Sequence, residues 1–378
     1  MTAEAKVKSF IEENNMAGGY GPVLLAVSGG SDSVCMLYIL KKIFDEKKRR
    51  IAVFHFNHLL RDTSDRDERF VEKLCAGLDV PFYHESGNVA GWARENRCST
   101  EEAARILRYE ALMRCRERIG ADRVATAHHR SDQAETILFS LCRGSGLQGL
   151  AGIRPVRDCV IRPLLCLEKE EIDRYISDNN IEYVTDETNE DDDISRNFIR
   201  HRIIPGLEER INSKAVYHIS ETARLSGLAW DYILENAKDA YKRCLKEESG
   251  NRTVLDIDML ELQHELIKRE IIRLAIFYLT GTRKDIGEVH ISDVLLLTKK
   301  QSGRRIDLPY GILAKREYGC LVLFVRSQDE TKDHTARQKE GVSREYFYIS
   351  REELLKGEQI RHLEHEGCSY EVVMKTED

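Results

Sequence analysis

The stretch with the clearest chemistry is Ser28-Gly29-Gly30-Ser31-Asp32-Ser33, where small and polar residues stand between two apolar segments. The segment before it, residues 23–27, is typical of a buried strand, and residues 34–40 have the apolar spacing of a helix. Glycine lets the backbone approach a ligand closely, and the first amide groups of a helix have no intrahelical acceptor. Because the helix dipole also favours negative charge there, the stretch predicts a phosphate site.

Two common phosphate loops do not fit these residues. A Walker-type loop requires Lys followed by Ser or Thr after its last glycine, and the dinucleotide fingerprint requires a third spaced glycine and an acidic residue about twenty positions later. Neither set is in place here. The pattern S-G-G-x-D-S instead resembles the loop of the N-type ATP pyrophosphatases, although six such residues alone also fit an ordinary helix cap.

A second polar cluster occupies residues 124–136, which are predicted to form a strand that ends in two histidines and then a helix. Asp132 and Glu135 are three residues apart, so their carboxylates share one helix face. Paired carboxylates beside a phosphate site repel each other unless a cation lies between them, and either Mg²⁺ or an ammonium-bearing substrate would serve. His129 alone also fits a histidine bonded within the turn. Arg143, in a glycine-rich loop, offers a guanidinium that could bind phosphate with two hydrogen bonds.

Alternating strands and helices must bring these clusters together. Residues 51–56 and 80–84 are predicted strands, and residues 65–78 and 99–119 are predicted helices. Such alternation implies parallel pairing with right-handed crossovers, and ligands bind at the carboxyl ends of the strands. We therefore expect an α/β fold with a doubly wound parallel sheet and the site at that edge. The resemblance of the loop to the N-type ATP pyrophosphatases implies the Rossmann-like, adenine nucleotide α-hydrolase-like type.

Composition limits the classes of protein that the chain can belong to. Its 378 residues predict roughly two or three domains, and 42% hydrophobic with 33% charged residues is typical of a soluble globular protein. The net charge of −7 predicts no global attraction to nucleic acid or membrane, so an RNA-binding surface would have to be a local basic patch. Ten cysteines without a C-x-x-C pair indicate reduced thiols in a cytoplasmic protein, and no stretch is long enough to span a membrane.

The series of motifs along the chain resembles the tRNA(Ile)-lysidine synthetases, bacterial enzymes of the N-type ATP pyrophosphatase, or PP-loop, family. The motifs that carry this resemblance are residues 28–33, 57–61, 105–109, 126–136, 143–153, 162–165, 186–191 and 196–201. The resemblance implies a ligase that forms a carbon–nitrogen bond. ATP adenylates the C2 oxygen of the wobble cytidine, pyrophosphate leaves, and the lysine ε-amine then attacks C2 and expels AMP. The product, lysidine, changes codon recognition from AUG to AUA.

The resemblance also implies cofactors, partners and site residues. The cofactors are ATP and Mg²⁺, the partners are L-lysine and tRNA(Ile) with a CAU anticodon, and relatives favour a homodimer. Residues that would bind ATP and pyrophosphate are Ser28, Gly29, Gly30, Ser31, Asp32, Ser33 and Arg143, with Asp32 beside the metal. Catalytic roles fall to Asp32, Arg108 and His129; lysine would be bound by Asp132, Glu135 and Arg196. Many relatives have two successive acids where this chain has Ser131 and Asp132, and the base that deprotonates lysine stays open between a carboxylate and His129.

Three regions are expected along the chain. Residues 1–212 would form the PP-loop ATP-binding catalytic domain, residues 213–300 a helical tRNA-recognition domain, and residues 301–378 a short β-containing C-terminal region. The last region lacks the motifs of the basic domain by which longer members grip the acceptor arm, so the chain is expected to be a short member or a truncated one. A PP-loop tRNA thiolase and a non-catalytic ATP-binding relative are the alternative functions.

Overall fold

The computed structural model describes residues 1–59, 64–184, 195–283, 285–325, 359–365 and 368–374. The chain divides into two compact units, Met1–Tyr232 and Ile233–Asp378. Several predicted features lie outside the described residues: positions 60 and 61 of one motif, the motif at 186–191, and residues 326–358. Among the described helices, none is long and apolar enough to cross a membrane.

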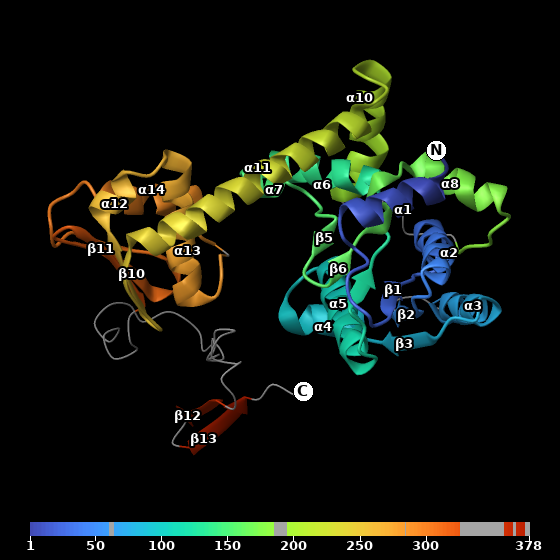
Figure 1. Cartoon of the computed structure of the whole chain (residues 1–378), viewed down its shortest axis with the longest axis horizontal. Coiled ribbons are helices and arrows are strands. Elements are labelled where there is room, and N and C mark those ends of the chain that lie inside the picture. The colour runs from blue at the N-terminus through green and yellow to red at the C-terminus, as the bar shows by residue number, and fades with distance from the viewer. Residues whose placement is uncertain (60–63, 185–194, 284, 326–358, 366–367, 375–378) are drawn as a thin grey trace. The chain divides into compact units, whose positions relative to one another are not determined.

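The first unit is built on a six-stranded sheet (Figure 1). Its strand order is β3-β2-β1-β4-β6-β5, and all neighbours are parallel except β5 and β6. This confirms the predicted α/β fold with a parallel sheet. The strands are β1 (Val23–Ala26), β2 (Ile51–Asn57), β3 (Phe82–Ser86), β4 (Arg123–Ala125), β5 (Val156–Arg157) and β6 (Val160–Ile161).

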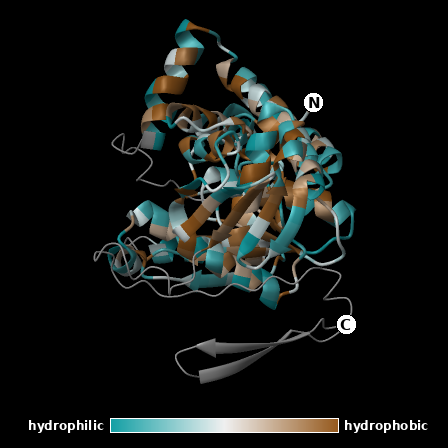
Figure 2. Cartoon of the chain, turned by 90° about the vertical axis from the view of Figure 1, so that its left-hand side faces the viewer, coloured by the Kyte–Doolittle hydropathy of each residue, from teal (hydrophilic) through white to brown (hydrophobic). Residues whose placement is uncertain are grey.

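Helices cover both faces of this sheet, which has hydrophobic strands (Figure 2). Strand β1 shows the division, because Val23 and Leu25 pack into one core and Leu24 into the other. The first core lies under α1 (Ala3–Glu13), α2 (Ser31–Glu46), α3 (Ser64–Gly77) and α8 (Lys169–Asp178). The second lies under α4 (Val89–Asn96) and α5 (Thr100–Arg118). Both faces of the sheet are therefore buried against helices, which leaves the ends of the strands for a ligand.

The strand order identifies the part of the sheet where a ligand is expected to bind. Strand β1 pairs with β2 on one side and with β4 on the other, so the direction of winding reverses between β1 and β4. In open α/β sheets the crevice at such a reversal, outside the carboxyl ends of the strands, is where ligands bind. The predicted phosphate loop follows β1, and the histidine pair follows β4.

The remaining elements of the first unit are helical. Strand β4 is followed by α6 (Arg130–Cys142), the short α7 (Leu147–Leu150) and the 3-10 turn η1 (Pro163–Cys166). Farther along come α9 (Ser195–Phe198), the π-helical turn η3 (Ile199–Ile203), α10 (Ile204–Arg210) and the long α11 (Ala215–Cys244). Ile199, Ile204 and Val216 share a small core with Ala134 of α6. This core holds η3 against α6.

The second unit joins helices and a five-stranded antiparallel sheet around one core. Its helical elements after α11 are α12 (Ile257–Glu261), α13 (Glu265–Thr280), α14 (Glu288–Leu297) and the 3-10 turn η4 (Pro309–Gly311). The sheet order is β7-β8-β11-β10-β9, from β7 (Leu245–Ser249), β8 (Arg252–Asp256), β9 (Arg305–Asp307), β10 (Ile312–Glu317) and β11 (Cys320–Val325). Strands β12 (Gln359–His365) and β13 (Cys368–Met374) pair separately.

One detail of the second unit differs from the sequence prediction. The range 213–300 is mainly helical as expected, but it also contains the β7–β8 hairpin. Helices α12 and α13 are separate, because the His264 side chain caps α13 by accepting from the Leu266 amide at 3.3 Å. Core residues come from both sides of position 300, so packing does not divide the chain there. The three-part domain division stays a prediction.

Candidate active site

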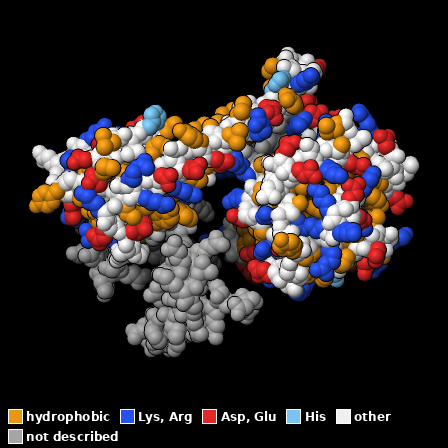
Figure 3. Space-filling model, in the orientation of Figure 1, with side chains coloured by type: hydrophobic (Ala, Val, Ile, Leu, Met, Phe, Trp, Pro, Cys, Tyr) orange, Lys and Arg blue, Asp and Glu red, His pale blue; other side chains and the backbone are white. Residues whose placement is uncertain are grey.

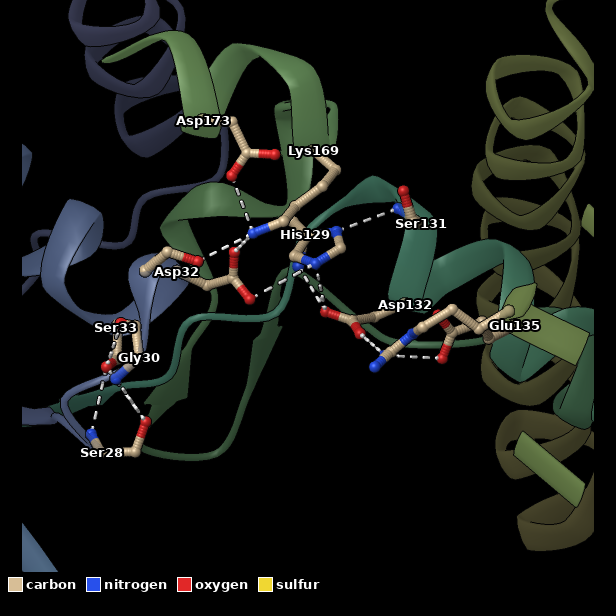
Figure 4. Close-up of polar contacts among 12 residues, drawn as sticks. Ser28, Gly30, Asp32, Ser33, His129, Ser131, Asp132, Glu135, Lys169 and Asp173 are labelled. Carbon is tan, nitrogen blue, oxygen red and sulfur yellow. Dashed lines mark hydrogen bonds and ion pairs between the residues drawn. The ribbon is translucent and has the colours of Figure 1, made fainter. Parts of the chain in front are cut away.

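The phosphate loop is held in shape by one hydroxyl group, the Ser33 Oγ. It accepts the amides of Ser28 at 3.1 Å and Gly29 at 3.2 Å, and it donates to the Gly30 carbonyl at 2.9 Å (Figure 4). Gly29 has a φ of +100°, which disfavours any residue with a Cβ. The backbone therefore needs glycine at this position and a hydroxyl at the buried Ser33.

The loop ends as helix α2 begins. Gly30 is the N-cap of α2, and the first intrahelical bond runs from the Val34 amide to the Gly30 carbonyl at 3.0 Å. The amides of Ser31, Asp32 and Ser33 come before that bond and have no intrahelical acceptor. Three such amides at a helix N-terminus are what binds a phosphate group. Gly30 supplies no side-chain cap in their place.

Lys169, at the start of α8, is the cation nearest the loop in the contacts of the described residues. Its ammonium donates to Asp32 Oδ1 at 2.6 Å and to Ser31 Oγ at 2.9 Å, and it lies 3.0 Å from Asp173 Oδ1. Burial acts to lower the pKa of Lys169, but the charges and hydrogen bonds of Asp32 and Asp173 together outweigh it, so the pKa is raised. Lys169 thus stays charged beside the predicted phosphate position.

His129 lies between the loop and the carboxylate pair. Its Nδ1 accepts the Ser131 amide at 3.2 Å, so the neutral ring carries its proton on Nε2. Nε2 faces Asp32 Oδ2 at 3.7 Å and Asp132 Oδ2 at 3.5 Å (Figure 4). The turn hydrogen bond expected for an ordinary histidine is therefore present on one nitrogen, while the other still connects the two acidic sites.

The carboxylate pair has a partner that comes from elsewhere in the chain. Arg200, in η3, donates from Nε to Glu135 Oε1 at 2.6 Å and from Nη2 to Glu135 Oε2 at 3.0 Å and Asp132 Oδ1 at 3.2 Å. Asp132 Oδ2 accepts the His129 amide at 2.9 Å. Burial raises the pKa of Glu135, whose side chain is only 1% exposed, and the Arg200 guanidinium acts in the opposite direction.

Two of the predicted arginines lie near a residue that the sequence did not single out, His128. Burial comes first among the causes that lower the pKa of His128 to about 4, and the charges of Arg162, Arg108 and Arg196 add to it. Arg108 and Arg196 are both exposed. His128 is thus neutral near pH 7, in a region where exposed arginines can meet an anion.

Arg143 is placed differently from the other predicted residues. It is the C-cap of α6, it is exposed, and its guanidinium lies 5.2 Å from the centre of the Phe139 ring. Within the part of the chain that the structure describes, Arg143 contacts neither the loop nor the carboxylate pair. The structure therefore brings together the loop, His129, Asp132 and Glu135, and leaves Arg143 outside this group.

Comparison with known proteins assigns the chain to a family. Residues 1–207 match the family model described as a PP-loop domain. The chain is 33% identical over 385 residues to a tRNA(Ile)-lysidine synthase of Caldanaerobacter subterraneus subsp. tengcongensis, covering 99% of this chain and 82% of that one. It is 35% identical over 272 residues to the tRNA(Ile)-lysidine synthase of Petrotoga mobilis, covering 72% and 84%. The chain belongs to the tRNA(Ile)-lysidine synthase family. Members of this synthase (synthetase) family are ligases, and their PP-loop domain uses ATP.

A solved structure shares the fold at a greater distance. The U34-tRNA thiolase NcsA from Methanococcus maripaludis, with its [4Fe-4S] cluster, matches 59% of this chain and 78% of its own with a TM-score of 0.51. Sequence identity over that match is 16%. This chain and the thiolase thus have a similar fold over the matched region.

Sequence reasoning did not place three residues in this lysidine synthase family site: Lys169, Arg200 and His128. A signal existed for Arg200, because it lies four residues after Arg196 and therefore one helical turn away. Lys169 follows the 162–165 motif by four residues, but nothing local shows that it meets Asp32. His128 was visible as half of the histidine pair, and only its surroundings distinguish it from His129.

Proposed function

We propose that the chain joins L-lysine to C2 of the wobble cytidine of tRNA(Ile) with a CAU anticodon, through an adenylated cytidine, and releases AMP and pyrophosphate. Activation is chemically necessary because a carbonyl oxygen is a poor leaving group and an adenylate is a good one. The family assignment and the arrangement of the site both support this reaction. The reaction would take place in the cytoplasm. The helices of residues 213–300 would contact the tRNA.

In the first step the loop would hold the β- and γ-phosphates of ATP as pyrophosphate leaves. The amides of residues 31–33 and the Lys169 ammonium face the same place from two elements. Asp32 would hold Mg²⁺, since this ion is usually bound by one or two carboxylates and the substrate phosphates. The ion would offset phosphate charge. Arg108 and Arg143 would neutralise the remaining negative charge as the adenylate forms.

His129 suits the role of a hydrogen-bond donor better than that of a base. Its Nδ1 is occupied by the Ser131 amide, and its Nε2 already carries a proton. A proton on Nε2 can donate to an anionic oxygen, such as one on the transferring phosphoryl group, but leaves no free lone pair on the ring. We therefore assign the stabilisation of negative charge to His129.

In the second step the lysine ammonium would lie against Asp132 and Glu135, with Arg196 near the lysine carboxylate. The ammonium must lose a proton to attack C2, and Glu135 is the better acceptor because burial raises its pKa. The N–C2 bond forms while the C2–O bond to AMP breaks, and Glu135 takes the proton from nitrogen. Many relatives have an acid where this chain has Ser131, but this difference does not affect the assignment. Asp132 keeps the second acidic position, and its carboxylate accepts from Arg200.

One observation carries the proposal: a single histidine, His129, lies within 3.7 Å of Asp32 in the loop and 3.5 Å of Asp132 in the amine site. The test measures pyrophosphate release and incorporation of labelled lysine, with a CAU-anticodon isoleucine tRNA transcript or the matched methionine tRNA. We expect both signals only with the isoleucine transcript, and no release from Asp32→Ala. Lysine-independent pyrophosphate release without any lysine incorporation would refute the proposed ligation.

A further inference from the structure

The amine site that we propose already holds a cation of the chain itself. Both oxygens of Glu135 accept from Arg200, and Asp132 Oδ1 accepts from the same guanidinium. The fourth oxygen, Asp132 Oδ2, accepts the His129 amide. Every oxygen of the pair therefore has a donor, and three of the four have Arg200.

Because Glu135 is buried, Arg200 and a substrate ammonium cannot both contact its oxygens. The Glu135 side chain is 1% exposed, so a substrate ammonium has no open path to its oxygens while the guanidinium covers them. Arg200 itself is partly exposed, with 36% of its side chain accessible, so it can turn outward into water. A lysine ammonium can contact Glu135 only after Arg200 has left it.

We infer that Arg200 is the internal occupant of the amine site and that the substrate's primary ammonium replaces it there, cation for cation. This inference rests on the proposed function and adds the residue that sets the site's selectivity. The exchange keeps one positive charge opposite two carboxylates, so a neutral amine or an amino acid with an uncharged side chain gives no compensation for the lost ion pair. Selection of a cationic side chain follows from the exchange.

The element that carries Arg200 suits such a movement. Arg200 belongs to the π-helical turn η3, between the short α9 and α10, and π-helical turns occur frequently at functional sites. Ile199 and Ile204 anchor the two ends of this turn in the small core with Ala134. The guanidinium can therefore leave while the backbone stays docked on α6.

Exchange also prepares the chemistry. The guanidinium is what lowers the pKa of Glu135 against the effect of burial. The ammonium that replaces the guanidinium also favours the charged form of Glu135, but unlike a guanidinium it can give up a proton, so the exchange places a donor that can be deprotonated against Glu135. Arg200 is thus a positioning residue, which acts through Glu135.

The test measures binding of radiolabelled L-lysine to the full chain by equilibrium dialysis, without tRNA. Arg200→Gln removes the competing charge and is expected to lower the Kd for lysine about tenfold. Arg200→Lys keeps a cation but cannot make the bidentate contact with Glu135, so its Kd for lysine is expected to lie between those of wild type and Arg200→Gln. This variant keeps the test valid if Arg200→Gln unfolds. Arg210→Gln, an equivalent change at an exposed position of α10, is the matched control and is expected to bind like wild type.

Competition by a small guanidinium compound gives a second readout. Methylguanidinium reproduces the Arg200 head group, so it is expected to compete with lysine in Arg200→Ala and to have no such effect in Arg210→Ala. Unchanged or weaker lysine binding in the Arg200 variants, with binding still lost in Glu135→Gln, overturns the exchange and leaves the amine site standing. If neither wild type nor any variant binds lysine, the amine site of the proposed function is itself wrong, and the exchange falls with it.

Discussion

Removal of the Ser33 hydroxyl tests how the phosphate loop is built. In Ser33→Ala the amides of Ser28 and Gly29 lose their acceptor, and the Gly30 carbonyl loses its donor. Water can replace the lost partner at Ser28, which is exposed, but Gly29 is buried. An unsatisfied buried amide costs roughly 1–3 kcal/mol, so the Gly29 amide dominates the expected effect.

The loop can relax in the free protein to satisfy this amide, and ATP must then restore the binding conformation. A cost of about 2 kcal/mol corresponds to roughly a 30-fold increase in the Kd for ATP. The carboxylate pair is bonded to Arg200 and the His129 amide rather than to Ser33, so the Kd for lysine is expected to stay within about twofold. Titration of each ligand separately measures both constants.

Ser9→Ala is a suitable control, because Ser9 Oγ donates to Glu13 on the exposed side of α1, far in sequence from the loop. It is expected to leave both constants unchanged. An ATP affinity in Ser33→Ala equal to wild type would refute the reasoning, since the loop would then keep its shape without the hydroxyl. An equal loss of ATP and lysine affinity would instead indicate general unfolding, which a thermal melt of the same sample detects.

Three further predictions concern the amine site and the packing around it. Glu135→Gln is expected to raise the KM for lysine about tenfold or more and the KM for ATP far less; equal rises in steady-state pyrophosphate release would contradict the lysine assignment. Gly152→Ala, at a φ of +57° with a Cβ that would overlap the Gln133 amide, is expected to lose roughly 1–3 kcal/mol of unfolding free energy in urea, whereas Gly206→Ala, which has open space, is not. Burial lowers the pKa of His128 from 6.5 to about 4, so the unfolded chain binds a proton more readily and the fold loses stability as pH falls from 6.5 to 4. His128→Gln removes this proton uptake and is expected to move the midpoint of acid unfolding to lower pH. An unchanged midpoint would contradict this reasoning.

Local patterns were enough to predict the loop and its elements. The apolar run before Ser28 and the helical spacing after Ser33 correspond to β1 and α2, and the predicted helix over 99–119 begins at the expected cap, with Ser99 Oγ accepting the Glu102 amide at 3.1 Å. These features depend on residues within a few positions of one another. The meeting of the loop with His129 also followed from sequence, because alternation of strands and helices fixes which strand ends share an edge.

The contacts that complete the site could not be predicted, because they join distant segments. Arg200 reaches Glu135 across 65 positions, and Lys169 reaches Asp32 across 137. Each depends on packing of a whole helix, not on the spacing of charged residues. The β7–β8 hairpin was hidden for another reason: LKEES has little β-propensity, and its pairing with β8 in the sheet overrides the local preference. Its signal was the Gly250-Asn251 turn.

Two cysteines that lie close to the site in sequence bear on the alternative of sulfur transfer, for which a thiolate would be needed. Cys35 lies on α2, next to the loop in sequence, and Cys166 ends η1, before α8; burial raises the pKa of each thiol to about 12. Near pH 7 both are protonated and unreactive. The paired carboxylates on α6 instead bind the Arg200 guanidinium, which supports the proposed amine nucleophile. The PP-loop domain uses ATP, and we infer that the side chains of α6 decide what attacks the activated carbon.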